Sequence, residues 1–473
     1  MVDTTKLIPG LPTGTPIADR IEFGRSARKK LPRKSLGDWT PPSDRADPVA
    51  LLTGQETTRI VTLVPVRHAR MAVSPFTFYR GAAIVMAADL GMTMDSGLWA
   101  QICGDAHLSN FGVFGSAERN LVFDVNDFDE TSPGPFEWDL LRLSTSFVLA
   151  ARDRGADDQA ARSLAAMAAM SYQQVAALAA DRAYLENWYT MLTPEQILGV
   201  VSTTQPERKA KKATKEMERN EKAARKRDAW SAIRKLTEIG PDGNRQFLSQ
   251  PPLLVRLSPE LRSTLGVDFN DLAEKFTETL DVDRAALLGR YRLLDVAHKV
   301  VGVGSVGLPA LVGLLQGRDS EDLMVLQFKA AEASVLEKWT APSLFDHHGQ
   351  RVVVGQRLMQ ATGDPFLGWV RGPGGRDFYG RQLRDFKWSV DLNGLVGGKA
   401  LGYARLCGAT LALAHARAGD PVAISAYIGS NTTFADAAAQ FSLTYADLVE
   451  QDFARFTAAI ADGEITAFEQ ART

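Results

Sequence analysis

The chain has 473 residues, of which 45% are hydrophobic and 23% are charged. At ~100–200 residues per domain, this length allows about two to four compact units and excludes a fibre or a wholly disordered chain. Lys and Arg number 54 against 56 Asp and Glu, giving a net charge of −2, so a globally basic nucleic-acid binder is excluded. Two cysteines cannot form a disulfide framework, and neither a signal peptide nor a membrane span is evident. These features favour a cytoplasmic protein.

The first 66 residues are predicted to form an N-terminal arm, because the segment before residue 50 is rich in proline, glycine and charge. Its basic residues gather between Arg25 and Lys34. Such a cluster is more often a solvated tail than an anion-binding arm.

Residues 67–290 are predicted to be a mainly helical part. A helical pattern begins at Thr77, and the short apolar run LWAQIC reads as a strand. The runs FGVF and NLVFDV, joined by GSAERN, predict a hairpin, and helical periodicity follows from Trp138 to Ala180. Residues 207–228 carry mixed charges with a basic excess and predict an exposed helical insertion.

Residues 291–395 are predicted to be rich in β-structure, and residues 396–473 to be helical. The β-like runs are KVVGVGSVG, LPALVGLLQG, DLMVLQFK and QRVVVGQRLM. The C-terminal helices are expected to complete the helical part that precedes the β-rich one.

Two acidic loops flank the predicted hairpin. Asp105 and Asn110 follow the strand LWAQIC in a D-x-x-x-x-N pattern, and Asp127 and Asp129 follow the hairpin in NDFDE. A phosphoryl-transfer site needs these groups: one carboxylate orients the acceptor hydroxyl, while an amide oxygen and a second carboxylate hold Mg²⁺ on the phosphates. Asn110, Asp127 and Asp129 offer the oxygen ligands that Mg²⁺ prefers. The alternative is that Asp105 and Asp127 are turn-forming acids.

GDAHLSN resembles the catalytic loop of aminoglycoside-phosphotransferase-type kinases, and NDFDE resembles the metal-binding segment of that superfamily. The resemblance implies that Asp105 is the catalytic base, that Asn110 and Asp127 are Mg²⁺ ligands, and that Asp129 is an auxiliary acid. His107 would buttress the loop. The following PFEWDLLRL resembles the segment whose acid, here Asp139, braces the catalytic loop.

No glycine-rich hairpin precedes the segment that resembles a catalytic loop. The nucleotide-binding elements of such a kinase are therefore expected after it. VVGVGSVG, with Gly302, Gly304 and Gly307, resembles a kinase glycine loop, and LMVLQFK resembles the strand whose lysine, Lys329, contacts the ATP phosphates. Glycines let backbone N–H groups approach phosphates. The alternative is a glycine-containing turn beside a core strand.

The same resemblance implies further positions around the nucleotide. AAEASVLEKW would be the helix that carries the acidic partner of Lys329, which would be Glu337 or, as the second choice, Glu332. QRVVVGQRLM would be the strand leading into the hinge, which would place Met359 near the adenine.

The fold class predicted from this order is α+β. It is a two-lobed fold like that of protein kinases and aminoglycoside phosphotransferases, circularly permuted and with helical additions. The catalytic-loop half comes first and the nucleotide-cradling half later. LALAHARAGD resembles the helix that normally leads into a kinase catalytic loop, and the helix Phe78–Leu90 competes for that role.

A second resemblance is to a large bacterial family of unknown function. It rests on SPFTFYRG, GDAHLSNFG, FDVNDFDET and FYGRQLRDFK, and extends from about Arg67 to past Lys387. Arg80, Arg381, Arg384 and Lys387 fit this family but no kinase motif. Arginines suit bidentate recognition of phosphates or of an anionic acceptor, and equally suit structural ion pairs.

The function expected from the sequence is ATP- and Mg²⁺-dependent phosphoryl transfer to an unidentified acceptor. Two alternatives remain: transfer of the nucleotidyl (AMP) group, and a pseudokinase-like module that only binds nucleotide. A metal-dependent hydrolase lacks the histidine-rich ligand set that such sites often show. The sequence leaves the acceptor and the oligomeric state open.

Overall fold

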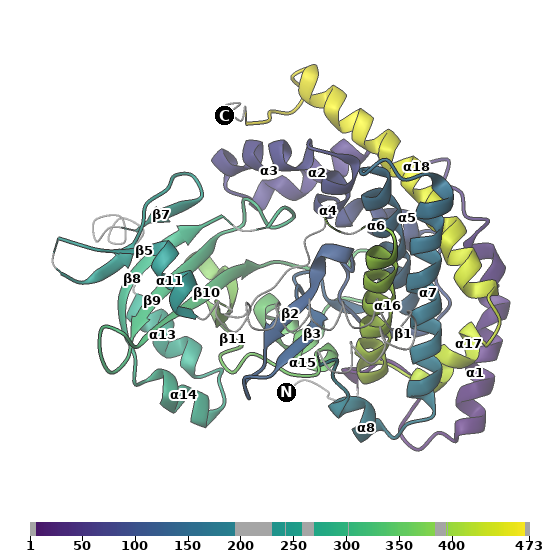
Figure 1. The fold of residues 1–473 in the computed structure, drawn as a ribbon, viewed down its shortest axis with the longest axis horizontal. Coiled ribbons are helices and arrows are strands. Elements are labelled where there is room, and N and C mark those ends of the chain that lie inside the picture. The colour runs from purple at the N-terminus through teal and green to yellow at the C-terminus, as the bar shows by residue number, and fades with distance from the viewer. Residues whose placement is uncertain are drawn as a thin grey trace.

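In the computed structural model, a sheet-containing part lies beside a helical part, as Figure 1 shows. The structure describes residues 6–193, 229–241, 243–257, 269–300, 302–383, 394 and 396–468. The predicted basic insertion at 207–228, together with Arg384 and Lys387, lies outside these residues. The mixed α+β class is confirmed. Within the described residues, no helix combines the length and apolar composition needed to cross a membrane.

The sheet has six antiparallel strands in the order β11-β12-β10-β9-β8-β7. Three of its strands, β8, β9 and β10, form a meander. Lys329 of β10 pairs with Ala310 of β9 on one side and with Tyr379 of β12 on the other. The predicted runs LPALVGLLQG and LMVLQFK are therefore strands. The bounds are β7 Leu254–Arg256, β8 Arg292–Lys299, β9 Ala310–Gln316, β10 Leu323–Ala331, β11 Gly368–Arg371 and β12 Asp377–Gln382.

Both faces of the sheet are covered, because alternate residues of a strand point to opposite faces. Val325 packs in a cluster with Ile233 of α11, while Leu326 packs in another with Phe276 of α13. The sheet part therefore begins well before the boundary predicted at 291. Its smaller elements are α11 Ala229–Leu236, β5 Thr237–Ile239, β6 Arg245–Phe247, α13 Phe269–Thr277 and α14 Val282–Leu288.

The helical part surrounds one large apolar core. In Figure 1, α6, α7 and α16 lie beside one another, and α18 runs along the outer edge. α16 approaches α7 closely at Gly408, where an added Cβ would lie 2.1 Å from the Ala168 carbonyl oxygen. The bounds are α6 Phe136–Arg152, α7 Asp158–Ala180, α8 Tyr184–Tyr189, α16 Gly398–Ala418, α17 Pro421–Ile428 and α18 Thr433–Ala461.

The N-terminal segment is folded onto this core and is not a solvated tail, and two of its basic residues bind the core while others in the cluster are exposed. Arg28 Nε donates to the Tyr427 carbonyl at 2.8 Å, and Arg33 Nη1 donates to the Ile428 carbonyl at 2.5 Å. These carbonyls end α17, where cations favour the helix dipole. The bounds are α1 Ile17–Lys30, η2 Arg33–Leu36, α2 Pro48–Gly54, η3 Gln55–Thr58, η4 Val61–Leu63 and α3 Val64–Met71.

The segment between α3 and α6 carries the predicted hairpin, β2 with β3, and a second short sheet in which β1 pairs with β4. The strand predicted for LWAQIC is β1, and the helical pattern predicted from Thr77 corresponds to α4 and α5. The bounds are α4 Pro75–Gly81, α5 Ala83–Gly91, β1 Trp99–Ile102, η5 Leu108–Asn110, β2 Phe111–Gly115, β3 Leu121–Val125 and β4 Ser132–Pro135.

The strand predicted for QRVVVGQRLM is wrong, because this segment is the helix α15 His348–Met359. Its consecutive valines favour a strand locally, but Val352 and Val353 are both buried in the core on the inner side of the helix. The His347 side chain caps the helix by accepting a hydrogen bond from the Gln350 N–H at 3.3 Å.

The helix predicted for AAEASVLEKW is also wrong. β10 continues to Ala331, and turns follow. Ser334 N–H donates to the Glu337 carboxylate at 2.9 Å, and the Ser334 hydroxyl donates to the Glu130 carbonyl at 2.7 Å. The Leu336 N–H also donates to the Ser334 hydroxyl at 3.2 Å. A serine side chain that bonds the backbone two residues later in this way competes with a helix.

Two glycines of α16 offer a matched test of helix packing. We expect Gly408→Ala to destabilise the protein by about 1–3 kcal/mol, because the new methyl group clashes with the Ala168 backbone. Gly402→Ala should be neutral or stabilising by about 0.5–1 kcal/mol, since nothing lies within 4 Å of its Cβ position. Urea unfolding of both variants measures the difference. Equal effects would contradict this account of the α7–α16 contact.

Candidate functional site

The loop that follows β1 is held by a buried carboxylate at its base. Asp139 of α6 accepts hydrogen bonds from the backbone N–H groups of Cys103 at 2.8 Å and Gly104 at 2.9 Å. Gly104 has φ +77°, and an added Cβ would lie 2.4 Å from the Glu130 carbonyl oxygen. Only glycine fits this turn without strain. The sequence resemblance had indicated this bracing position for Asp139.

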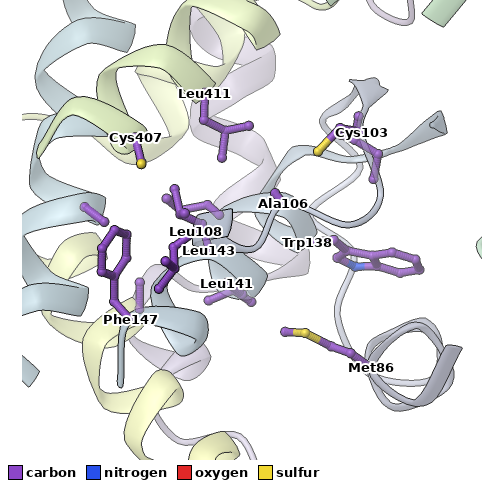
Figure 2. Packing of buried hydrophobic residues seen from close by; sticks show 14 of the residues in the cluster. Met86, Cys103, Ala106, Leu108, Trp138, Leu141, Leu143, Phe147, Cys407 and Leu411 are labelled. Carbon is purple, nitrogen blue, oxygen red and sulfur yellow. The ribbon is translucent and has the colours of Figure 1, made fainter. Parts of the chain in front are cut away.

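Apolar residues of the same loop anchor it in the helical core. Figure 2 shows Ala106 and Leu108 lying near Leu141 and Leu143 of α6, with Leu411 of α16 close by. Cys103 is also buried, as expected for a small core residue. Because the apolar side chains face the core, the polar residues between them are left to face the opposite side.

Asp105 lies at the opposite side of this loop, next to a buried arginine. Arg142 Nε donates to Asp105 Oδ1 at 2.5 Å, and Arg142 Nη2 also donates to the Tyr79 carbonyl at 3.0 Å. The other carboxylate oxygen, Oδ2, lies 3.7 Å from His107 Nε2. Burial raises the pKa of Asp105 above its ordinary value, although Arg142 opposes the shift. A carboxylate with a raised pKa suits a general base.

Asn110 is fixed against the backbone of Asp105. Its Nδ2 donates to the Asp105 carbonyl at 2.8 Å, so the amide oxygen is the atom available to a ligand. The two residues of the D-x-x-x-x-N pattern therefore form one rigid unit, as the predicted metal and base positions require.

The second acidic loop meets the sheet through Lys329 of β10. Lys329 Nζ lies 2.5 Å from Asp129 Oδ2 and 3.6 Å from Asp127 Oδ1, although Asp129 is 200 residues away in the chain. Asp129 Oδ1 also accepts a hydrogen bond from the Tyr379 hydroxyl at 2.6 Å. Burial acts to lower the pKa of Lys329, but the Asp127 and Asp129 carboxylates outweigh it and raise the pKa above its ordinary value. The ammonium is therefore permanently charged.

The predicted ion pair between Lys329 and Glu337 is wrong. Glu337 lies 3.6 Å from Arg351 Nε and accepts a hydrogen bond from the Ser334 N–H. The second choice, Glu332, accepts a hydrogen bond from the Thr58 hydroxyl instead. The reason is that no helix follows β10, so neither glutamate is carried back toward the lysine.

Met359 does not lie at a nucleotide site. Its side chain is fully buried in the apolar core, with Sδ 3.9 Å from the Thr131 hydroxyl, and its carbonyl accepts a hydrogen bond from Arg417 at 2.6 Å. The prediction for Met359 is wrong because the segment is the helix α15, whose last turn is buried in the core. The predicted strand would instead have led to a hinge.

A cavity of about 380 Å³ separates the two acidic loops from the glycine segment. Gly302 and Gly304 line it, in the loop that joins β8 to β9. Gly307 does not line it, but has φ +93° and accepts a hydrogen bond from the Ile60 N–H at 2.8 Å. The cavity-lining residues are Arg59, Arg80, Asp105, His107, Ser109, Asn110, Phe111, Asp127, Asp129, Glu130, Gly302, Val303, Gly304, Ser305, Leu308 and Tyr403.

The N-terminal segment holds the glycine loop from outside. Arg59 Nη1 donates to the Val306 carbonyl at 2.5 Å, and Arg70 Nη1 donates to the Gly302 carbonyl at 2.6 Å. No sequence motif points to Arg59, because it lies in the predicted arm. Glu130 and Tyr379 were also missed as site residues, although both lie within motifs that the sequence singles out.

The residues present fit a magnesium ion that is shared with phosphates. Asn110 and Asp127 both line the cavity and offer one amide and one carboxylate. Mg²⁺ is usually held by one or two carboxylates together with substrate phosphates and water. Asp129 fits less well, because Lys329 and Tyr379 already engage its two oxygens. Among the described residues, no group of three or more His, Cys, Asp or Glu side chains forms a metal cluster by itself.

A family model described as "Uncharacterized protein conserved in bacteria (DUF2252)" matches residues 59–459. The chain therefore belongs to this family, as its sequence motifs predicted. The comparison with curated proteins gave no match, and the comparison with solved structures gave none. The family description carries no activity, so the function is argued from the site alone.

Replacement of Lys329 tests how far the site depends on its ion pairs. We expect Lys329→Met to destabilise the protein by about 1–3 kcal/mol, because Asp129 would lose its cation while remaining largely buried. Lys275→Met is the control, since Lys275 pairs with Asp271 on an exposed helix surface. Thermal and urea unfolding provide the measurement. A Lys329→Met protein as stable as the control would show that the pair does not hold the acidic loop.

Proposed function

We propose that this member of the family is an ATP- and Mg²⁺-dependent phosphotransferase that acts on a hydroxyl group of an acceptor. One observation carries the proposal: Asp105, Asn110, Asp127 and the glycine loop all line one cavity, and Lys329, which is not among the lining residues, lies 3.6 Å from Asp127. These are the groups that phosphoryl transfer requires, and they come from opposite halves of the chain.

The order of the elements around the cavity supports the same proposal. A strand, the Asp105 loop, a hairpin, the Asp127 loop and a strand that pairs with the first follow one another in the chain. This order resembles the catalytic half of a kinase. The meander β8 to β10, with the glycine loop and Lys329, resembles the nucleotide half but comes later in sequence. A circularly permuted kinase-like fold accounts for both resemblances.

Each residue has a distinct part in the proposed reaction. Asn110 and Asp127 would hold Mg²⁺, which neutralises charge on the phosphates, and Lys329 would bind phosphate oxygens. The acceptor oxygen forms a bond to the γ-phosphorus while the bond from that phosphorus to the β–γ bridging oxygen breaks, and ADP leaves. Asp105 takes the proton of the acceptor hydroxyl, through the carboxylate oxygen that Arg142 does not hold.

Transfer of AMP would use the same side chains with a different part of the nucleotide, and a binding module would use them without reaction. The position of Asp105 favours a reaction, because a base held beside a metal site has no role in binding alone. The products separate the possibilities: phosphoryl transfer releases ADP, nucleotidyl transfer releases pyrophosphate, and a binding module releases neither.

Asp127→Ala should abolish Mg²⁺-dependent binding of ATP, because it removes the principal metal carboxylate. Titration calorimetry with ATP in the presence and absence of Mg²⁺ measures this. Asp158→Ala is the control, since Asp158 is an exposed acid on α7. An unchanged Mg²⁺–ATP affinity in folded Asp127→Ala would exclude Asp127 as the principal metal ligand.

Asp105→Asn should leave Mg²⁺–ATP affinity within about threefold and lower turnover by about 10²-fold or more, because a positioned general base contributes that much to rate. The amide can still accept a hydrogen bond from Arg142, so the fold should be kept. Release of ADP, with water or a screened acceptor as the nucleophile, provides the readout. Turnover within a few-fold of the unaltered protein would exclude Asp105 as the base.

A further inference from the structure

Arg80, in the last turn of α4, is an arginine of the cavity wall that the proposed reaction has not used. Its Nε is buried and has no hydrogen-bond partner among the described residues. Among the described residues its guanidinium forms no direct ion pair; it lies over the Phe76 ring, whose centroid is 5.9 Å away, and interacts electrostatically with Asp105. A partly buried cation without a directly bonded anion is stabilised by an anion that binds beside it.

Two other arginines near the site are buried and bonded through their guanidinium groups, although Arg351 Nε, like Arg80 Nε, has no hydrogen-bond partner among the described residues. Arg142 donates to Asp105 and to the Tyr79 carbonyl, and Arg351 donates to the carbonyl groups of Asp129, Thr131 and Glu332. These two arginines therefore have a structural role. Arg80 differs from them because its guanidinium borders open space that a ligand could fill.

The position of Arg80 is fixed between the glycine loop and the predicted base. An added Cβ on Gly304 would lie 3.4 Å from the Arg80 carbonyl oxygen, so the backbone of Arg80 packs against the tip of the loop. The guanidinium also interacts electrostatically with Asp105, whose Oδ1 is already taken by Arg142. An anion placed between the loop and Asp105 would therefore meet Arg80.

The nearby His107 is a second sign that this end of the cavity takes a ligand. His107 is 3% exposed and lines the cavity, yet its Nδ1 has no hydrogen-bond partner within the described residues. Burial keeps the pKa of His107 well below its ordinary value, so the ring is neutral and adds no charge. Arg80 thus supplies the cationic character here, while its neighbour offers an uncharged polar atom.

We propose that Arg80 binds the γ-phosphoryl group of ATP, on the side of that group opposite Lys329 and the metal ligands. This inference rests on the proposed function. A kinase pattern places no arginine here, and an arginine that contacts the transferred group stabilises the charge of the transition state. The assignment makes the site selective for a nucleoside triphosphate over a diphosphate, because only the triphosphate carries the group that Arg80 contacts.

The experiment compares Mg²⁺–ATP with Mg²⁺–ADP by titration calorimetry on the full chain. Arg80→Met should weaken ATP binding by about tenfold or more while ADP binding changes less than about twofold, because a lost charge-assisted hydrogen bond affects only the triphosphate. Arg80→Lys should recover part of the ATP affinity. Arg162→Met, which removes a half-exposed arginine of α7, is the charge control and should change neither.

The outcomes separate this inference from the proposed function. If the unaltered protein binds neither nucleotide, both are overturned. If it binds both in a manner that Asp127→Ala abolishes, but Arg80→Met affects ATP and ADP equally or not at all, only the assignment of Arg80 fails. If Arg80→Met does not fold, as judged by its unfolding transition, Arg80→Gln replaces it and the same comparison decides.

Discussion

The ion pair between Lys329 and the acidic loop is the contact on which the arrangement of the site depends. It joins the central strand of the sheet to a loop of the helical part, and so fixes the two parts of the molecule at the cavity. Arg351 of α15 reinforces the same junction, because it donates to the carbonyls of Asp129 and Thr131 from the other side. A charged group buried at this junction would be unfavourable alone, and each cation is stable there because the opposite loop supplies its partners.

Three further sets of contacts hold the loops around the cavity. Asp139 fixes the base of the Asp105 loop, the apolar residues of that loop lock it into the helical core (Figure 2), and the N-terminal segment fastens the glycine loop through Arg59 and Arg70. Without these contacts the loops would be free to move independently. Holding them from outside reduces the ordering cost that a ligand must meet on binding.

The structure also departs from the kinase pattern in a way that changes the role of two elements. Lys329 pairs with the acidic loop, whereas the helix expected to carry its acidic partner is absent after β10; the later helix α15 contributes the buried Arg351 to the same loop. The extra arginines at the cavity, Arg59 and Arg80, come from the segment that precedes the Asp105 loop. The proposed phosphotransferase would thus combine familiar metal and base positions with cations of its own.

The sequence by itself determined the local elements around the site and the residues of the acidic loops. Short apolar runs specified the hairpin β2–β3 and the strands β9 and β10, and the spacing of Asp105, Asn110 and Asp127 identified side chains that line one cavity. Only the tertiary structure decided the partner of Lys329, the helical state of the valine-rich α15, and the burial of Met359. The physical reason is that burial against distant segments outweighs local propensity, and that an ion pair across 200 residues leaves no periodic trace in the sequence.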